Sequence, residues 1–378
     1  MSPAHTRPRR LAALVGAVLT FALVAIAITA SPAAAADQPG VVFALTNSAA
    51  GNAVAIYSRA ADGALTAAGS VSTGGLGTGG GLGSQGALAL SDDGSRLYAV
   101  NAGSNSVSAF SVASGTLTLL GAVPSGGVLP VSVTAYGNLV YVVNAGVSGV
   151  SAGSISGFTA GPSGALTPLA GSTRPLSAAN VGPAQIGFSP DGSTLVVTEK
   201  ATNTVDTYAV GANGLAAGPV AHASSGATPF GFAFDKRGTL IVSEAFGGAA
   251  SALSSYGLAG GFTTLSPSVA ATGQKAACWV VTTKNGRYAY TTNTASGTVS
   301  AYAIGQDGSL ALLRAVAGTT GGAPTDAALS VNSHFLYVLN AATHRIDVFR
   351  AEADGSLTSL PTAGVAGLPT GATGVVAF

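Results

Sequence analysis

Charged residues are scarce in this 378-residue chain, at 8% of positions against 47% hydrophobic residues. Residues 1–36 hold three of the 15 Lys and Arg and none of the 14 Asp and Glu, so the remainder has 12 basic and 14 acidic residues, a net charge of −2. No run of basic residues occurs after residue 36. Because nucleic-acid-binding surfaces are usually basic, the composition argues against a nucleic-acid partner.

Cysteine occurs once, as Cys278, so no disulfide can form within the chain. The four histidines are scattered, and a metal centre needs several such ligands close together. The glycine-rich stretch GGLGTGGG (Gly74–Gly81) lacks the following Lys-Ser/Thr of a phosphate-binding loop. The sequence therefore predicts no metal site and no cofactor. The surrounding low-complexity segment, Ser70–Gly86, is predicted to be a long flexible loop.

The N-terminal segment has the pattern of a secretory signal. A basic start, RPRR (Arg7–Arg10), precedes the apolar stretch Leu11–Ala30 and a small-residue cleavage site ending at Ala36. We predict that residues 1–36 are removed and that the protein is secreted or in the cell envelope, with no membrane attachment after cleavage. The apolar stretch is also long enough to span a bilayer, so an uncleaved anchor is the alternative. Two adjacent arginines allow the twin-arginine route.

One phrase recurs along the rest of the chain. SDDGSRLYAVNAGSNSVSAFSV (Ser91–Val112) returns in similar form at Ser189–Val210, Thr283–Ile304 and Ser330–Ala351. Each copy has short apolar segments separated by turn residues of the Asp-Gly type, which is typical of β-hairpins. No segment shows a sustained helical period. Four antiparallel strands repeated every 40–50 residues or so is the spacing of β-propeller blades.

Counting the ends of the second strands gives the number of blades. These ends are Asn47, Asn101, Asn144, Glu199, Glu244, Asn293 and Asn340. The first copy lacks an opening strand, and the chain ends with an unassigned strand, Gly374–Phe378. We predict an all-β, seven-bladed propeller of four-stranded blades over residues 37–378, a single domain and a monomer. The C-terminal strand would close the first blade, which removes two free sheet edges.

The sequence resembles the β-propeller lactonase family, which includes phosphogluconolactonases and carboxymuconate cycloisomerases. The resemblance covers 41–378 and is clearest in GPAQIGFSPDGSTLVVTE and TPFGFAFDKRGTLIVSE. It implies hydrolysis or cycloisomerisation of a small lactone in the central channel, without a metal. Family members that form lactones carry a histidine, often beside an arginine, in an inner strand. Here Gln185 and Gly231 stand at the histidine position, and Ala184 and Phe230 at the arginine position.

Propeller geometry places the ends of second strands and the starts of first strands on one face, where we expect the site. Glu199 and Glu244 replace the Asn of the other blades and are candidate general bases; the alternative is that each closes a turn. His222 is a third catalytic candidate, since histidine titrates near neutral pH. Candidate substrate-binding residues on this face are Gln185, Trp279, Asp326, Lys275, Arg174, Lys200, His344 and Arg345.

Two functions remain open. The first is a lactonase-like enzyme in which Glu199 or Glu244 activates water and Lys275 with Arg174 supplies positive charge. The second is a non-catalytic propeller that binds a small-molecule ligand, a glycan or a protein partner through the same face. The absence of an arginine cluster disfavours a phosphorylated sugar as the substrate.

Overall fold

The computed structural model describes residues 1–4 and 37–378. The range Asp37–Phe378 is one compact unit. Most of the predicted signal segment, residues 5–36, lies outside the described residues, so its cleavage and the export of the protein stay predictions. No helix within the described ranges is long and apolar enough to cross a membrane.

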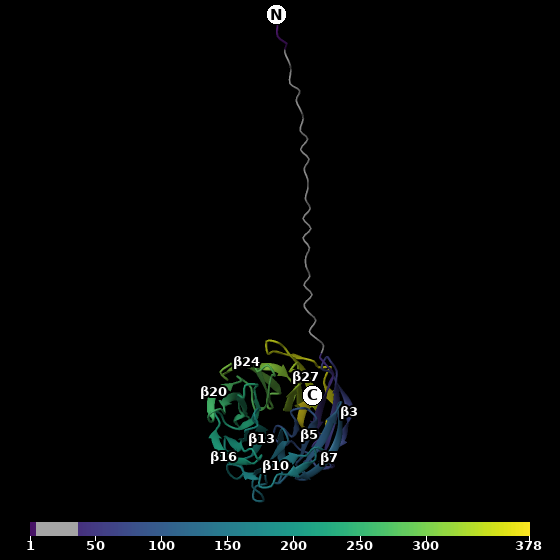
Figure 1. Cartoon of the computed structure of the whole chain (residues 1–378), viewed down its shortest axis with the longest axis vertical. Coiled ribbons are helices and arrows are strands. Elements are labelled where there is room, and N and C mark those ends of the chain that lie inside the picture. Colours follow the sequence, from purple (N-terminus) through teal and green to yellow (C-terminus); the bar gives the residue numbers. More distant parts are fainter. Residues whose placement is uncertain (5–36) are drawn as a thin grey trace. The chain divides into compact units, whose positions relative to one another are not determined.

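Residues 37–378 form seven antiparallel sheets in a ring, which confirms the predicted seven-bladed propeller (Figure 1). From the channel outward, blade 1 contains β30 (Thr373–Ala377), β1 (Gly40–Leu45), β2 (Ala53–Arg59) and β3 (Leu65–Ser72). Blade 2 contains β4 (Leu88–Leu90), β5 (Arg96–Asn101), β6 (Ser106–Ala113) and β7 (Thr116–Pro124). Blade 3 contains β8 (Pro130–Tyr136), β9 (Leu139–Asn144), β10 (Ser154–Ala160), β11 (Leu166–Pro168) and β12 (Arg174–Pro175).

The other four blades follow in chain order. Blade 4 contains β13 (Pro183–Phe188), β14 (Thr194–Glu199), β15 (Thr204–Val210) and β16 (Ala216–Ala223). Blade 5 contains β17 (Pro229–Phe234), β18 (Leu240–Glu244), the 3-10 turn η1 (Phe246–Gly248), β19 (Ala252–Gly257) and β20 (Thr263–Ala270). Blade 6 contains β21 (Ala277–Thr282), β22 (Tyr288–Asn293), β23 (Thr298–Ile304) and β24 (Leu310–Thr319). Blade 7 contains β25 (Pro324–Leu329), β26 (Phe335–Asn340), β27 (Arg345–Ala351), β28 (Leu357–Ser359) and β29 (Val365–Ala366).

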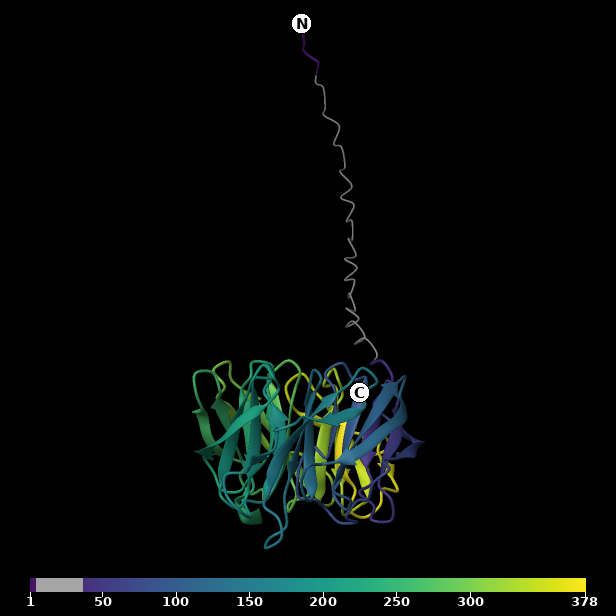
Figure 2. The ribbon, with the colours of Figure 1, turned by 60° about the horizontal axis from the view of Figure 1, so that its bottom comes forward.

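The strands run between two loop-bearing faces, which Figure 2 shows from the side. In blade 4 the inner strand β13 leads to a tight turn, and β14 returns so that Pro183 pairs with Glu199. The Asp191 carboxylate closes this turn by accepting a hydrogen bond from the Ser193 N–H (3.1 Å). We call the face with these turns the turn face, and the opposite face, where the second strands end, the Asn face.

The C-terminal strand completes blade 1 as predicted. β30 pairs with β1 from Val42↔Ala377 to Leu45↔Thr373. At the turn face the Val41 N–H donates to the Phe378 carbonyl (3.0 Å), and the Phe378 N–H donates back to Val41 (2.8 Å). The two ends of the propeller are therefore joined by main-chain hydrogen bonds.

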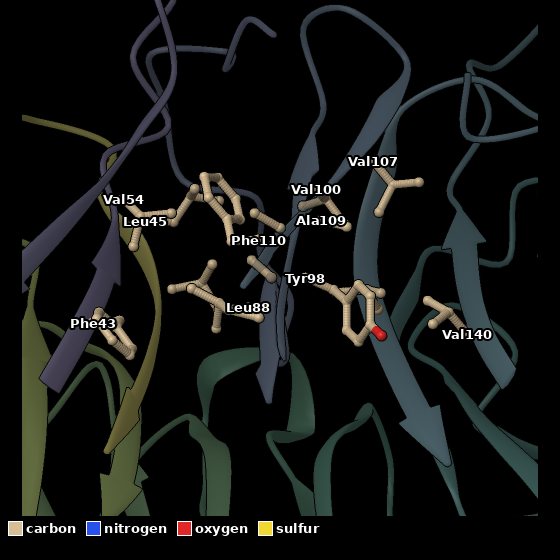
Figure 3. Packing of buried hydrophobic residues seen from close by; sticks show 14 of the residues in the cluster. Phe43, Leu45, Val54, Leu88, Tyr98, Val100, Val107, Ala109, Phe110 and Val140 are labelled. Carbon is tan, nitrogen blue, oxygen red and sulfur yellow. The ribbon is translucent and has the colours of Figure 1, made fainter. Parts of the chain in front are cut away.

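The core lies between the blades. Second strands are nearly continuous apolar runs because a neighbouring blade covers each of their faces; in β5, Leu97, Tyr98 and Val100 are at most 1% exposed. Figure 3 shows side chains of blades 1, 2 and 3 in one such cluster, including Phe43 and Phe110. Burying a side chain of this size contributes about 1.5–3 kcal/mol, so packing alone can hold a ring that has no disulfide.

The glycine-rich segment is a long loop after β3, as predicted, and parts of it are packed against the blades; its flexibility stays a prediction. Its first residues finish β3, the middle residues lie against the Asn-face ends of blades 1 and 2, and its last residues, Ser84–Gly86, reach blades 3, 4 and 6. The Asn47 amide donates to the Gly80 carbonyl (2.6 Å). A Cβ atom on Gly77 would lie 2.1 Å from the Asn47 carbonyl carbon, and one on Gly103 would lie 2.1 Å from the Gly77 oxygen. These glycines allow close backbone approach.

Candidate functional site: a channel closed at one end

The inner strands enclose two adjoining cavities, of about 240 Å³ and about 300 Å³. The first borders blades 2 to 5, and the second borders blades 1, 2, 4, 6 and 7. Gly86, Leu88 and Gln185 line both. Their linings extend toward the turn face as far as Phe188 and Leu329. We call the two cavities together the half-channel, because they occupy only the part of the channel toward the turn face.

Residues Ser84–Gly86 cross the channel at the Asn-face end of the half-channel, and we call them the plug. The Ser84 hydroxyl donates to Val131 O in blade 3 (2.8 Å). The Gln85 N–H donates to Ala184 O in blade 4 (2.9 Å). The Gln85 side-chain amide pairs with both main-chain groups of Val280 in blade 6, at 2.9 and 3.0 Å. The plug of blade 2 is thus held by three other blades.

Gly231 makes room for the plug. A Cβ atom at this position would lie 2.1 Å from Gln85 Oε1. Gly231 stands at the position where the sequence comparison above places the histidine of lactone-forming family members. The lack of a side chain there leaves room for the Gln85 amide, which crosses the channel. A histidine at 231 and the plug as seen here are sterically incompatible.

Three predicted residues meet around the plug. Trp279, which is 4% exposed, donates from Nε1 to Ser84 O (2.9 Å). The Gln185 side-chain amide donates from Nε2 to Phe232 O (3.0 Å) and accepts at Oε1 from the Phe232 N–H (2.6 Å). Lys200 donates from Nζ to Gly83 O (2.5 Å) and lies 4.8 Å above the Phe230 ring centre.

The Asn-face end of the channel is consequently covered by the plug and by a buried apolar cluster that includes Phe230, Cys278 and Trp279. Burial lowers the pKa of Lys200. Burial also raises the pKa of the neighbouring Cys278 thiol to about 11. Because only the thiolate is a strong nucleophile, Cys278 is a packing residue here.

Asp326 is the one ionisable residue among those that line the half-channel in the described chain. It lies on β25 and is 2% exposed. Its carboxyl group accepts from the Ala327 N–H (2.7 Å) and from the Val375 N–H of β30 (3.2 Å). Burial outweighs these hydrogen bonds and raises its pKa to about 8, so the carboxyl group is mostly protonated at neutral pH.

Glu199 and Glu244 do not line the half-channel; both are fully buried at the Asn-face ends of their strands. Glu199 accepts from the Ser177 N–H (3.0 Å) and the Thr202 hydroxyl (2.8 Å). Glu244 accepts from the Gly226 N–H (2.6 Å) and the Ser254 hydroxyl (2.7 Å).

Each glutamate therefore anchors the loop that enters its blade. The equivalent Asn144 and Asn340 donate to loop carbonyls, Ser125 O at 3.3 Å and Thr320 O at 2.8 Å. In blades 4 and 5 the loop offers N–H donors, which explains why an acceptor-only side chain replaces the amide. This geometry favours the turn-closing alternative over the role of general base, which stays a prediction.

The remaining predicted residues lie away from the half-channel. His222 is on the outer strand β16, stacked on Phe262 with ring centres 4.2 Å apart, and burial lowers its pKa. Arg174 is on β12 at the edge of blade 3 and donates to Gly171 O (2.8 Å). Arg345 pairs with Asp347 (2.8 Å) beside the half-buried His344, and Lys275 is exposed in the loop before β21. None of these residues lines the half-channel together with Gln185, and their predicted roles in catalysis and substrate binding stay predictions.

Sequence reasoning missed Gln85 and Asp206. Gln85 falls in a low-complexity stretch, and no local pattern shows that its amide reaches blade 6. Asp206 lies seven residues after Glu199, at the β15 position where blades 2 and 6 have Ser108 and Ser300. This spacing in the repeat could have predicted that the two carboxyl groups are neighbours. The described residues contain no group of three or more His, Cys, Asp or Glu that could hold a metal.

Glu199 and Asp206 form a buried carboxyl pair that should make stability depend on pH. Both accept from the Ser177 N–H, at 3.0 and 3.1 Å. Burial, and then the adjacent Glu199, raise the pKa of Asp206 well above its usual range. The folded protein holds this proton at pH values where the unfolded chain has lost it, so stability falls as pH rises from about 4 toward the folded-state pKa.

We expect the free energy of unfolding to be several kcal/mol lower at pH 8 than at pH 5. Asp206→Asn should remove roughly half of this slope, because the buried Asp326, whose pKa is also raised to about 8, contributes in the same direction. Urea unfolding at both pH values measures it. Asp93→Asn is the control, because hydrogen bonds from Ser91 and Ser95 lower the pKa of the exposed Asp93 to about 2. An unchanged slope in Asp206→Asn would show that the pair does not share a proton.

Comparison with known proteins agrees with this fold. A family profile described as lactonase, 7-bladed beta-propeller, matches residues 43–170 and 245–367, about two thirds of the chain. The chain belongs to this lactonase family. The stretch between the two matched parts, 171–244, holds Gln185, Glu199 and Lys200. No curated protein matched this lactonase-family chain.

Solved structures share the fold at low sequence identity. A candidate 6-phosphogluconolactonase from Bacteroides fragilis has a TM-score of 0.70 and 20% identity, covering 92% of this chain and 99% of the other. The periplasmic gluconolactonase of Pseudomonas aeruginosa has a TM-score of 0.69 and 17% identity, covering 89% and 98%. A chain of a nidogen/laminin complex has a TM-score of 0.50 and 12% identity, covering 72% and 95%.

Proposed function

We propose that this lactonase-family protein binds an uncharged lactone in the half-channel and hydrolyses it. The observation that carries the proposal is the lining. It is a largely apolar wall with four polar side chains, Asp326, Gln85, Gln185 and Thr134, and no Lys, Arg or His among its residues. A cavity with few convergent polar groups is a usual ligand site. Of the two lactone types named for similar structures, the lining fits the unphosphorylated one, because no cation faces a phosphate.

Asp326 would act as the general base. In its ionised form it takes a proton from water, the water oxygen bonds to the lactone carbonyl carbon, and the ring C–O bond breaks. Asp326 then returns the proton to the departing ring oxygen. Gln85 and Gln185 each use one amide hydrogen on a main-chain carbonyl, and the second hydrogen of each amide can stabilise the oxyanion.

Asp326→Asn should lower kcat/KM for an uncharged lactone about a hundredfold, the usual contribution of a general base. In the wild type, kcat/KM should rise between pH 6 and pH 8 as Asp326, with a pKa of about 8, loses its proton. The measurement is ring opening of glucono-δ-lactone and of aliphatic lactones, followed by acid release. Asp354→Asn, at an exposed turn of blade 7, is the matched control.

Two results would contradict this function. One is full turnover by a folded Asp326→Asn variant. The other is a preference for the 6-phosphorylated lactone. Melting temperatures of both variants show whether lost activity reflects lost folding, since the substitution also changes the contact between β25 and β30.

A non-catalytic propeller is the second candidate. It is favoured because Asp326, Gln85 and Gln185 already have main-chain partners and because Glu199 and Glu244 are buried beneath loops. The similar fold in a nidogen/laminin complex shows that propellers also serve in protein assemblies. Saturable lactone binding without ring opening, or no lactone binding at all, would favour this candidate, whose partner would be a ligand, a glycan or a protein.

A further inference from the structure

A separate cavity of about 330 Å³ lies between blades 2 and 3 on the turn face and shares no lining residue with the half-channel. Its polar lining includes Asp92, Asp93, Arg96, Tyr98 and Asn138. Four of these side chains are exposed or half-buried, whereas Tyr98 is 1% exposed. Tyr98 therefore forms the base of the cavity, which we call the interblade pocket.

The Tyr98 hydroxyl is without a hydrogen-bond partner among the residues that the structure describes. Tyr141 and Tyr337 occupy the same repeat position, third in their second strands. The hydroxyls of these two tyrosines donate to the next blade's outer turn, at Gly214 O (2.7 Å) and Gly63 O (3.2 Å). Figure 3 shows the Tyr98 ring on the side of blade 2 toward Val140 of blade 3.

Arg96 explains why the same contact is not made at Tyr98. Its guanidinium group reaches the outer turn of blade 3 and donates to Pro162 O (3.3 Å). A Cβ atom on Gly164 of that turn would lie 2.2 Å from Arg96 Nε. Arg96 therefore occupies the turn that corresponds to the acceptor turns of Tyr141 and Tyr337, and a polar pocket remains beside Tyr98. In blade 6 the equivalent Tyr290 hydroxyl also has no partner among the described residues, but it is fully buried.

The pocket combines acceptors and donors without a dominant charge. Asp92 uses Oδ2 to accept from the Gly137 N–H (3.3 Å), which leaves Oδ1 available. Asp93 is engaged by the Ser91 hydroxyl (2.6 Å) and the Ser95 N–H (2.9 Å). The two carboxylates disfavour an anion and the guanidinium group disfavours a cation. Hydroxyl groups, which both donate and accept, match such a lining.

We propose that the interblade pocket binds a small, neutral, hydroxyl-rich ligand such as a single sugar ring. The Tyr98 hydroxyl at its base and the Asp92 carboxylate at its rim would hold ligand hydroxyls. This site goes beyond the lactone function proposed above and is independent of it, because the two cavities have no residue in common.

The test uses the full chain and titrations followed by saturation-transfer NMR. The probes are methyl β-D-glucopyranoside, tetramethylammonium chloride and sodium acetate. We expect the glucoside alone to bind, and Tyr98→Phe or Asp92→Asn to weaken it about threefold to tenfold, the loss of one hydrogen bond. Tyr337→Phe is the matched control: it removes the equivalent hydroxyl, which donates to Gly63 O and does not line the interblade pocket. It should lower the melting temperature and leave glucoside binding unchanged.

The outcomes are decisive in both directions. Glucoside binding that weakens in Tyr98→Phe and not in Tyr337→Phe supports the proposal. Glucoside binding that is unaffected by Tyr98→Phe, preferential binding of either ion, or no binding of any probe overturns it. Lactone turnover in the Tyr98→Phe variant should equal that of the wild type, which separates this proposal from the function of the half-channel.

Discussion

A chain that ends at Leu368 should lose cooperative unfolding. This truncation removes β30, the inner strand of blade 1, and leaves the channel edge of β1 unpaired. It also removes Val375, which packs with residues of blades 1 and 7 and whose N–H group donates to Asp326. Thermal unfolding followed by circular dichroism should show a broad transition at lower temperature in place of a single sharp one.

The physical reason is that, among the described residues, β30 is the only strand from the C-terminal end of the chain that pairs with a strand of blade 1. Contacts between blades 7 and 1, such as the Tyr337 hydroxyl on Gly63 O, remain but pair no strands. With one cysteine no disulfide can replace the strand, and the truncation leaves the inner edge of β1 as a free sheet edge. Phe378→Ala is the control, because it keeps the main-chain pairing of Phe378 with Val41 and removes only a half-exposed ring. A truncated chain that melts as sharply and at the same temperature as the full chain would show that β30 is not the closure.

Gln85→Ala should make Cys278 react with a thiol reagent roughly tenfold to hundredfold faster. The substitution removes both hydrogen bonds to Val280, and each contributes about 0.5–1.5 kcal/mol to holding the plug. Cys278 and Trp279, the only cysteine and tryptophan of the chain, lie at the cover that the plug completes. Once the thiol is less buried, its pKa also falls from about 11 toward its ordinary value.

Gln185→Ala is the matched control for the plug. Gln185 makes the same two amide contacts, but to Phe232 of the adjacent blade and not across the channel. It should change stability without exposing Cys278. Quenching of Trp279 fluorescence by acrylamide gives a second readout of the same opening. Equal labelling rates in the wild type and in Gln85→Ala would mean that Ser84–Gly86 is not what covers this end of the channel.

Much of the fold follows from local pattern. Turn residues at Asp191-Gly192 and the apolar run of β14 recur in similar form in other blades, and each repeat specifies its own hairpins through short-range contacts. The number of blades follows from counting the ends of the second strands. The first blade then lacks an inner strand, and because each blade of a closed ring needs one, Gly374–Phe378 is assigned to that place.

The site was predictable only in part. Gln185 and Trp279 belong to the channel because their register within the repeat places them on inner strands. Glu199 and Glu244 share that face, but the loops of Ser177 and Gly226 fold over their carboxylates, and no sequence pattern encodes this burial. His222 and Arg174 were expected in loops near the channel, but both lie on the outer strands of their blades. The sequence does not show where the fourth strand of a blade ends, and this decides how far such a residue lies from the channel.

The sequence by itself determined the repeat, the seven blades, the closing strand and the family, because these depend on periodicity and on contacts between neighbours in the chain. Only the tertiary structure decided that the channel is closed at the Asn face and hollow toward the turn face. That outcome rests on Gln85 meeting Val280, 195 residues away, and on the space left at Gly231. Contacts between distant blades of this kind depend on the closed ring, which brings together residues that no local pattern relates.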